Sequence, residues 1–303
     1  LKLRATKSTA FRVPSVPELF GGVSEAQLTT VDPCTGWSAR APTSALYINC
    51  QAAGLPTTYT QIGNVIRTTV GGNPDLVPEN ADTLTIGAVW EPGFAEGLAF
   101  TLDYWQIELD GSIQSIPGTQ KLAICYNSAS RSHPFCGPQF HTRDPLTGEV
   151  NFLSAQPSNV GSEDAKGVDL GVRYGTTLFG LQTSFDLSVS RLDQYDVYPF
   201  TGATPIRYAG FITGGLGSYT EWRGTAGMAV KSERWTANWN LRYIGGADDI
   251  NVPTGLGSDV DAVVYNDLQF GYDVTDDLKV AVGVDNVLDE DAPPPPAAIA
   301  GDS

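Results

Sequence analysis

Strict alternation of apolar and polar side chains in residues 167–190 limits most strongly what this chain can fold into. Apolar residues occupy every second position from Val168 to Tyr174 and again from Leu181 to Val189, with Thr183 as the one exception. A period of two is typical of β-strands, whose successive side chains point to opposite faces. The polar row contains both Asp169 and Arg173, and the apolar row carries an aromatic residue beside the turn. Hydrocarbon on one face and water on the other would explain both features.

The same alternation predicts nine strands, which we place at residues 1–8, 83–90, 98–106, 167–174, 181–190, 222–230, 235–243, 266–273 and 278–284. The connections between them are alternately long and short. The short connections are residues 91–97, 175–180, 231–234 and 274–277. This order is typical of an antiparallel up-and-down meander whose long loops all lie at one end. We expect the long stretches 21–80 and 111–162 to be irregular, and 195–217 to be a loop rich in Tyr, Gly and Pro.

Charge and hydrophobicity exclude several classes of protein. The net charge of −16 disfavours a nucleic-acid partner, because phosphate binding needs clustered Lys and Arg. No apolar run approaches the roughly 18 residues of a transmembrane helix. The chain opens on LKLRATKS without a start methionine, and we interpret it as a fragment of a longer protein.

The four cysteines form two local pairs, Cys34 with Cys50 and Cys125 with Cys136. Neither spacing matches a CxxC metal or redox motif. Each pair lies in a long polar stretch, where loop-closing disulfides would form in an oxidising compartment. Free thiols are the alternative.

Six segments, in this order, resemble motifs of the TonB-dependent outer-membrane receptors. They are FRVPSVPELF (residues 11–20), GNPDLVPEN (72–80), LDYWQIELDGSI (102–113), KGVDLGVRY (166–174), YNDLQFGY (265–272) and VGVDNVLDE (282–290). The resemblance implies that residues 1–303 are the C-terminal part of a transmembrane β-barrel domain of about 22 strands, with long extracellular loops and short periplasmic turns. Such receptors lie in the outer membrane of Gram-negative bacteria and import scarce nutrients with energy supplied through TonB.

The resemblance also implies partners. A plug, a TonB box and a final strand with a terminal aromatic residue do not occur in these 303 residues, so contact with the TonB–ExbB–ExbD complex would depend on the missing plug. Outer-membrane lipid and lipopolysaccharide would surround the barrel. The transported ligand would be a ferric siderophore, or a carbohydrate or oligopeptide. No cofactor is expected.

Ligand contacts are expected from aromatic residues of the long loops and from charged residues of the polar row. Aromatic rings provide apolar contact, while a few polar groups set orientation. The candidates are Trp37, Tyr59, Tyr126, Tyr195, Tyr198, Phe200 and Tyr208, with Arg173 and Arg242 from the strands. The alternative is that the loop aromatics pack on one another. The other charged residues expected to face the barrel lumen in ion-pair networks are Asp103, Asp169, Asp186, Asp267 and Asp285.

Metal binding and catalysis find little support in the sequence. His133 and His141 are expected to be surface residues of a loop rather than haem or iron ligands. Four carboxylates at positions 248, 249, 259 and 261 could hold calcium, but they lack EF-hand spacing, and a solvated acidic rim is the other interpretation. No GxSxG or HExxH motif is present, so we do not expect an enzyme.

Two other classes of protein remain as alternatives. One is a soluble, secreted, acidic β-rich binding module or glycan-acting hydrolase. The other is a passive porin, which would not account for the segments at 11–20 and 72–80. The barrel hypothesis requires that the row containing Val168, Phe185 and Trp239 is not sealed beneath a helix or a second sheet.

Overall fold

The computed structural model describes residues 1–200, 202–213, 217–250, 252 and 258–294. Its chain forms two compact units. The sheet unit comprises residues 1–10, 80–110 and 162–303, and the loop unit comprises residues 11–79 and 111–161. Within the described ranges, no helix is both long and apolar enough to cross a membrane.

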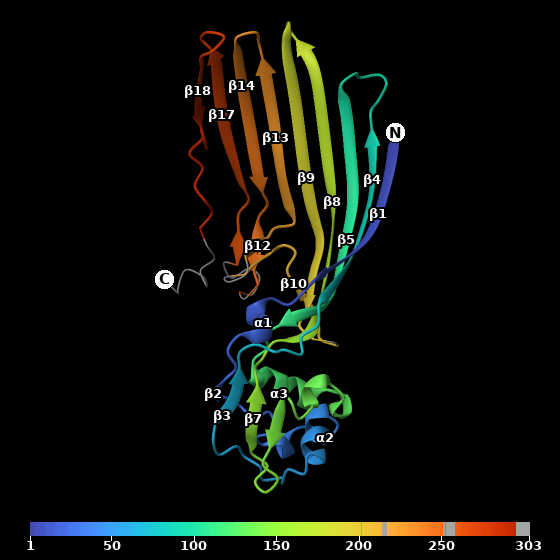
Figure 1. Cartoon of the computed structure of the whole chain (residues 1–303), viewed down its shortest axis with the longest axis vertical. Helices are drawn as coiled ribbons and strands as arrows, with labels where there is room; N and C mark the ends of the chain where they lie inside the picture. The colour runs from blue at the N-terminus through green and yellow to red at the C-terminus, as the bar shows by residue number, and fades with distance from the viewer. Residues whose placement is uncertain (201, 214–216, 251, 253–257, 295–303) are drawn as a thin grey trace. The chain divides into compact units, whose positions relative to one another are not determined.

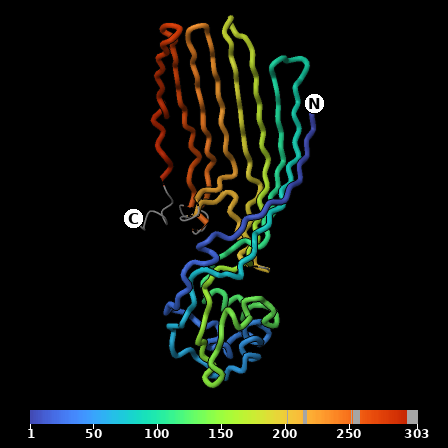
Figure 2. Tube along the Cα trace, viewed as in Figure 1, coloured from blue at the N-terminus to red at the C-terminus, as the bar shows by residue number. Residues whose placement is uncertain are grey.

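The sheet unit is built on a meander of nine consecutive strands, as the sequence predicts (Figure 1). Neighbours pair in an antiparallel manner in β4–β5 and throughout β8 to β18. The Cα trace in Figure 2 shows the short turns at one end of the sheet. The nine strands are β1 (Lys2–Arg12), β4 (Glu79–Trp90), β5 (Leu98–Gln114), β8 (Ser158–Leu178), β9 (Leu181–Tyr198), β13 (Trp222–Lys231), β14 (Trp235–Ile244), β17 (Val263–Asp273) and β18 (Lys279–Val284).

The expected loop at 195–217 is partly wrong, because β9 continues to Tyr198. Residues 201 and 214–216 of that segment lie outside the described residues. Short strands follow in the connections: β10 (Ile206–Arg207) pairs with β9, while β11 (Phe211–Thr213), β12 (Gly217–Tyr219), β15 (Ala247–Asp249) and β16 (Asp259–Val260) form a small separate sheet. Residues 295–303, in the proline-rich end of the chain, also lie outside the described residues.

The strand register aligns residues of one kind across the sheet. One row joins Tyr174, Phe185, Met228, Trp239, Leu268 and Val284. The adjacent row, on the other face, joins Arg173, Asp186, Gly227, Asn240 and Asp267. Apolar residues therefore share one face, which we call the apolar face, and charged residues share the other, which we call the polar face.

The apolar face is not covered. Phe185 is 36% exposed, Leu268 45% and Val284 51%. Near the short turns its aromatic rings pair across strands, with ring centroids 5.5 Å apart for Trp90 and Phe100. Large exposed apolar side chains would be costly in water, and their arrangement along a whole sheet face indicates a non-aqueous environment.

The expectation that 21–80 and 111–162 are irregular is wrong, because these segments fold together into the loop unit. Its strands are β2 (Ser24–Thr29), β3 (Val65–Val70), β6 (His141–Arg143) and β7 (Val150–Ser154), in the order β2-β3-β7-β6. Its helices are α1 (Val16–Phe20), η1 (Trp37–Ala39), α2 (Ala45–Ala52), α3 (Gly118–Asn127), η2 (Ala129–Arg131) and η3 (Pro134–Cys136). These elements are short, and β3 pairs with β7 across more than 80 residues of chain, so no local periodicity signals them.

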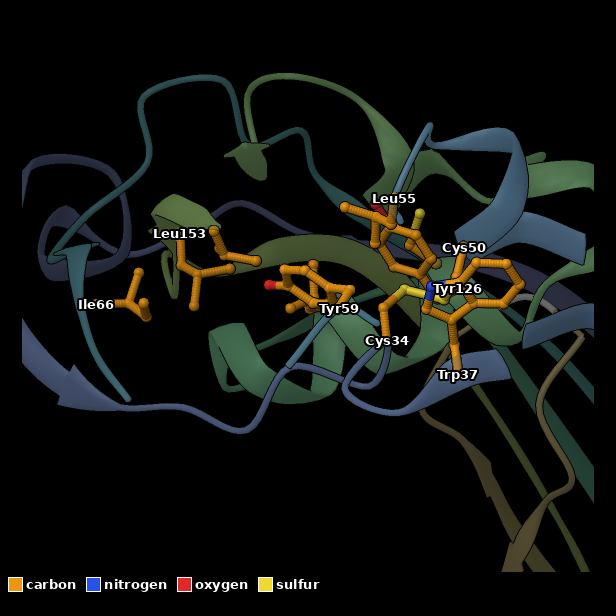
Figure 3. Close-up of a cluster of buried hydrophobic side chains, with 11 residues drawn as sticks. Cys34, Trp37, Cys50, Leu55, Tyr59, Ile66, Tyr126 and Leu153 are labelled. Carbon is orange, nitrogen blue, oxygen red and sulfur yellow. A yellow bond between two sulfur atoms is a disulfide. The ribbon is translucent and has the colours of Figure 1, made fainter. Parts of the chain in front are cut away.

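A hydrophobic core holds the loop unit together (Figure 3). Its members from the first segment are Cys34, Trp37, Cys50, Leu55, Tyr59 and Ile66, and those from the second are Leu122, Cys125, Tyr126, Val150 and Leu153. The two predicted disulfides, Cys34–Cys50 and Cys125–Cys136, are confirmed. Each disulfide closes a loop within one segment, so the link between the segments comes from packing and from polar contacts.

Candidate functional site

A buried ion pair joins the two segments of the loop unit. The Arg143 guanidinium donates hydrogen bonds to both carboxylate oxygens of Asp32, at 2.6 and 2.9 Å. The Tyr59 hydroxyl and the Cys34 backbone N–H donate to the same carboxylate, and Arg143 also donates to the Tyr126 hydroxyl. Burial favours a raised pKa for Asp32, but the hydrogen bonds and charge of Arg143 outweigh it and hold the pKa below its usual value.

Three of the predicted ligand contacts are part of this buried network or of the core around it. Trp37, Tyr59 and Tyr126 are 1%, 4% and 0% exposed. Arg143 lies over the rings of Tyr59 and Tyr126. In this structure the three rings pack inside the loop unit, so an external ligand does not reach them.

The histidines are buried, so their expected position on the surface is wrong. His133 is 9% and His141 6% exposed. The His133 Nδ1 accepts a hydrogen bond from the Phe135 N–H, and the His141 Nδ1 lies 3.1 Å from the Phe135 carbonyl oxygen. Burial, together with the nearby positive charges of Arg143 and Arg131, lowers the pKa of His141 to about 4, although the hydrogen bond with the Phe135 carbonyl acts in the opposite direction.

The low pKa of His141 predicts that acid destabilises the loop unit. The unfolded chain binds a proton near pH 6.5, whereas the folded unit binds it only near pH 4. The contribution of neutral His141 to the free energy of unfolding is therefore fully present above pH 6.5. It is lost as the pH drops toward 4, by roughly 2–3 kcal/mol. The loss can be measured by recording the thermal unfolding of the loop unit at several pH values between 7 and 4.5, with hydrogen exchange as the probe of unfolding.

The control for the acid effect is His141→Gln, which removes the titrating group. Burial lowers the pKa of His133 too, so the single substitution should flatten only part of the pH dependence. Replacing both histidines should flatten most of it. An unchanged pH profile in the double variant would contradict this explanation.

The polar face of the sheet unit contains a pocket of about 460 Å³. Its lining combines aromatic, cationic and acidic side chains, contributed by Trp105, Asp169, Ser190, Arg191, Leu192, Ser218, Tyr219, Thr220, Glu221 and Arg223. Arg223 donates hydrogen bonds to the Ser218 carbonyl and the Thr220 hydroxyl, which holds the segment that follows β12 against the sheet. The volume is within the range of small-molecule sites, about 300–1,000 Å³.

A cluster of three tyrosines adjoins this pocket. The ring of Tyr219 lies 5.0 Å from that of Tyr195 and 5.5 Å from that of Tyr208, measured between centroids. The Tyr195 hydroxyl donates to Glu163. Tyr195 and Tyr208 are predicted contacts that the structure brings together, whereas the sequence analysis missed Tyr219 because it lies just beyond the expected loop.

A β-bulge turns Tyr195 toward the polar face. Lys166 pairs with Gln194 and Gly167 pairs with Leu192, which leaves Asp193 as an extra residue in β9. An extra residue shifts the alternation by one position. Tyr195 therefore lies on the same face as the polar row, although its odd number would place it with Phe185 and Leu187 on the apolar face.

Trp105 was also missed, although its position carried a signal. It follows Asp103 by two residues in a strand and so belongs to the polar row. Gly167 makes room for its ring, because a Cβ at Gly167 would lie 2.6 Å from a ring carbon of Trp105. A large aromatic residue at a position of the polar row breaks the alternating pattern, and this exception can be recognised in the sequence.

The remaining predicted contacts do not line this pocket. Arg242 lies 3.7 Å from Asp267, and Arg173 is opposite Asp186 in the strand register. Tyr198 pairs with Ser162 on the face of β9 opposite to Tyr195.

Phe200 is half-buried beyond the end of β9. Asp103, another residue of the predicted charged row, forms a salt bridge with Arg4. This pair joins β5 to β1 across the intervening strand β4.

The acidic segment 248–261 is only partly described, since residues 251 and 253–257 lie outside the described residues. β15 and β16 bring Asp248 opposite Asp259. Asp249 is 1% exposed, so the interpretation of the segment as a fully solvated rim is wrong at that position. Among the residues that the structure describes, no group of three or more metal-binding side chains is found.

Comparison with known proteins identifies the family. The sequence model described as "TonB dependent receptor-like, beta-barrel" matches residues 1–287, nearly the whole chain. The chain belongs to the TonB-dependent receptor β-barrel family. Among curated proteins, a search of the sequence finds no match.

Solved structures of siderophore receptors share the fold. A mutant of the ferric enterobactin receptor PfeA from Pseudomonas aeruginosa is 14% identical, with a TM-score of 0.56 over 95% of this chain and 32% of that chain. The siderophore receptor PirA from Acinetobacter baumannii is 12% identical, with a TM-score of 0.53 over 95% of this chain and 35% of that one. This TonB-dependent receptor chain thus spans about a third of the length of these receptors.

Proposed function

We propose that this chain forms part of an outer-membrane receptor that binds a scarce nutrient and imports it with energy supplied through TonB. The observation that carries the proposal is the nine-stranded meander with one exposed apolar face, in a chain that matches the receptor family over residues 1–287. A soluble binding module would bury that face under a helix or a second sheet.

Residues 1–303 would supply nine strands of the barrel wall, and the short turns would face the periplasm. The long connections between the strands would lie on the outer side. The oxidised cysteines agree with a position outside the cytoplasm. Lipid and lipopolysaccharide would contact the apolar face, and the TonB–ExbB–ExbD complex would act through the receptor's plug.

A ferric siderophore is the ligand class that we favour over a carbohydrate or an oligopeptide. The pocket beside the tyrosine cluster offers aromatic surfaces from Trp105 and Tyr219 together with the cationic group of Arg223. Aromatic rings provide apolar contact and a guanidinium group attracts negative charge, which together suit an anionic metal chelate with an organic shell. The solved relatives include receptors whose names describe ferric enterobactin and siderophore binding, which supports the same class.

Uptake by the complete receptor tests this function. Cells that depend on the receptor should grow on a ferric siderophore under iron limitation, and growth should require TonB. Tyr219→Ala and Trp105→Ala should each weaken siderophore binding by about tenfold or more, equivalent to about 1.4 kcal/mol. Ligand titration by tryptophan or tyrosine fluorescence measures the affinity.

The matched control is Tyr198→Ala, which removes a tyrosine from the opposite face of β9 and should leave the affinity unchanged. Equal losses in all three variants would show that the pocket does not select the ligand. Growth on a sugar or peptide rather than on ferric siderophores would replace the proposed ligand class while leaving the receptor function in place.

A further inference from the structure

The turn between β8 and β9 has an unusual residue at its tip. Phe179 and Gly180 form a two-residue turn in which both have positive φ, 53° and 80°. Such a turn favours Asn, Asp or Gly at its first position, because other side chains are strained there. Phe179 is nevertheless fully exposed in the structure. A bulky apolar ring kept in a strained, exposed position indicates a role outside the unit itself.

The neighbouring short turn also presents a phenylalanine. Phe94, between β4 and β5, is 82% exposed. Its ring packs edge-on against Trp90 with centroids 6.2 Å apart, and Trp90 stacks on Phe100. The Gly175 N–H donates to the Gly97 carbonyl, so the turn containing Phe94 lies beside the β8–β9 hairpin.

Both rings lie at the short-turn end of the apolar face, and Phe94 contacts Trp90 of that face. Leu178 and Leu181 pair across the hairpin at the root of the turn, in register with the apolar face, and Phe179 follows at the tip. Residues 175–184 contain no charged side chain. The β4–β5 turn is less apolar, with Glu91 and Glu96 on either side of Phe94.

The other two short turns are charged instead. The β13–β14 turn carries Glu233 and Arg234, and the β17–β18 turn carries Asp276 and Asp277. Together with neighbouring side chains these turns line an open pocket of about 500 Å³. Of the four short turns, the β8–β9 turn is therefore the one without a charged side chain, and the β4–β5 turn combines an exposed ring with two carboxylates.

We propose that Phe179 and Phe94 insert into the headgroup and upper acyl region of the membrane leaflet beside the short turns, whereas the β13–β14 and β17–β18 turns remain in water. The two phenylalanines anchor one side of the barrel rim in lipid. Lipid is the partner because the two rings lie at the end of a face that already meets hydrocarbon, and because the β8–β9 tip offers no charge for a protein partner to pair. This inference rests on the proposed membrane-spanning function.

Site-specific fluorescence in the complete receptor tests the anchor. All four cysteines of this chain are joined in disulfides, so none of them competes with an introduced cysteine for the polarity-sensitive fluorophore NBD, and the unsubstituted receptor gives the background labelling. Phe179→Cys and Phe94→Cys place the label at the two tips. Asp276→Cys places it on a charged turn, and Leu187→Cys places it in the middle of the apolar face. Each labelled receptor is reconstituted into phosphatidylcholine vesicles that contain nitroxide lipids.

At positions 179 and 94 we expect emission at shorter wavelength than at position 276, and strong quenching by a nitroxide near the lipid headgroup. The label at position 187 should be quenched best by a nitroxide deep in the acyl chains. If the labels at positions 179 and 94 are quenched no more than the label at position 276, while the label at position 187 is quenched, the proposed lipid anchor is wrong. The proposed receptor function would then still stand. An unquenched position 187 would overturn both.

Discussion

Replacing Arg143 with Met should reduce the stability of the loop unit by about 3–5 kcal/mol, because it leaves the Asp32 carboxylate buried without its counter-charge. The Asp32 side chain is fully buried and that of Arg143 is 11% exposed. Tyr59 and the Cys34 N–H would still donate to the carboxylate, but neutral donors do not replace a guanidinium.

The loss can be measured by hydrogen exchange of loop-unit peptides in the complete receptor. The matched control is Glu25→Gln, which removes a salt bridge to Arg67 between two exposed side chains of the same unit. Such surface pairs contribute about 1 kcal/mol or less. Equal protection in the Arg143 and Glu25 variants would contradict the central role of the buried pair.

The second large effect is expected on the apolar face of the sheet. Leu187→Arg should destabilise the receptor folded in a phospholipid bilayer by about 2–4 kcal/mol, because it places a charge against hydrocarbon. Leu187 is 39% exposed, so a larger side chain at this position does not create a clash in a packed core. Denaturant titration of the complete receptor in vesicles measures the change.

The adjacent residue provides the control. Ser188 lies on the polar face, in register with Gly171 and Thr225, so Ser188→Arg should cost far less. If the two substitutions destabilise the receptor equally, the two faces of the sheet do not meet different solvents. A larger loss at Ser188 would reverse the assignment of the faces.

The strands could be predicted because their signal is local. Alternation within a strand depends only on the pleat of the backbone, so nine strands and four short turns can be recognised from neighbouring residues. On the long-connection side several strands were predicted too short, because β5 ends later, and β4 and β8 begin earlier, than the alternation indicated. There the strands leave the apolar region, and both faces become polar, as in residues 158–166 of β8.

The candidate pocket was only partly predictable. Tyr195 and Tyr208 stood out as aromatic residues, but the bulge at Asp193 decides which face Tyr195 occupies. A bulge depends on how two strands pair, and the sequence of one strand does not reveal it. The loop aromatics Trp37, Tyr59 and Tyr126 are buried in a core that the sequence did not reveal, because a ring in a long connection looks the same in sequence whether it binds a ligand or fills a core.

The alternating pattern was sufficient to predict a two-faced antiparallel sheet and its turn order, and six short motifs indicated the family resemblance, since each of these follows from residues close together in the chain. The loop unit, its buried Asp32–Arg143 pair and the face of Tyr195 emerge only when distant segments meet. Asp32 and Arg143 are 111 residues apart, and the energy of their contact exists only once the fold has removed water from both.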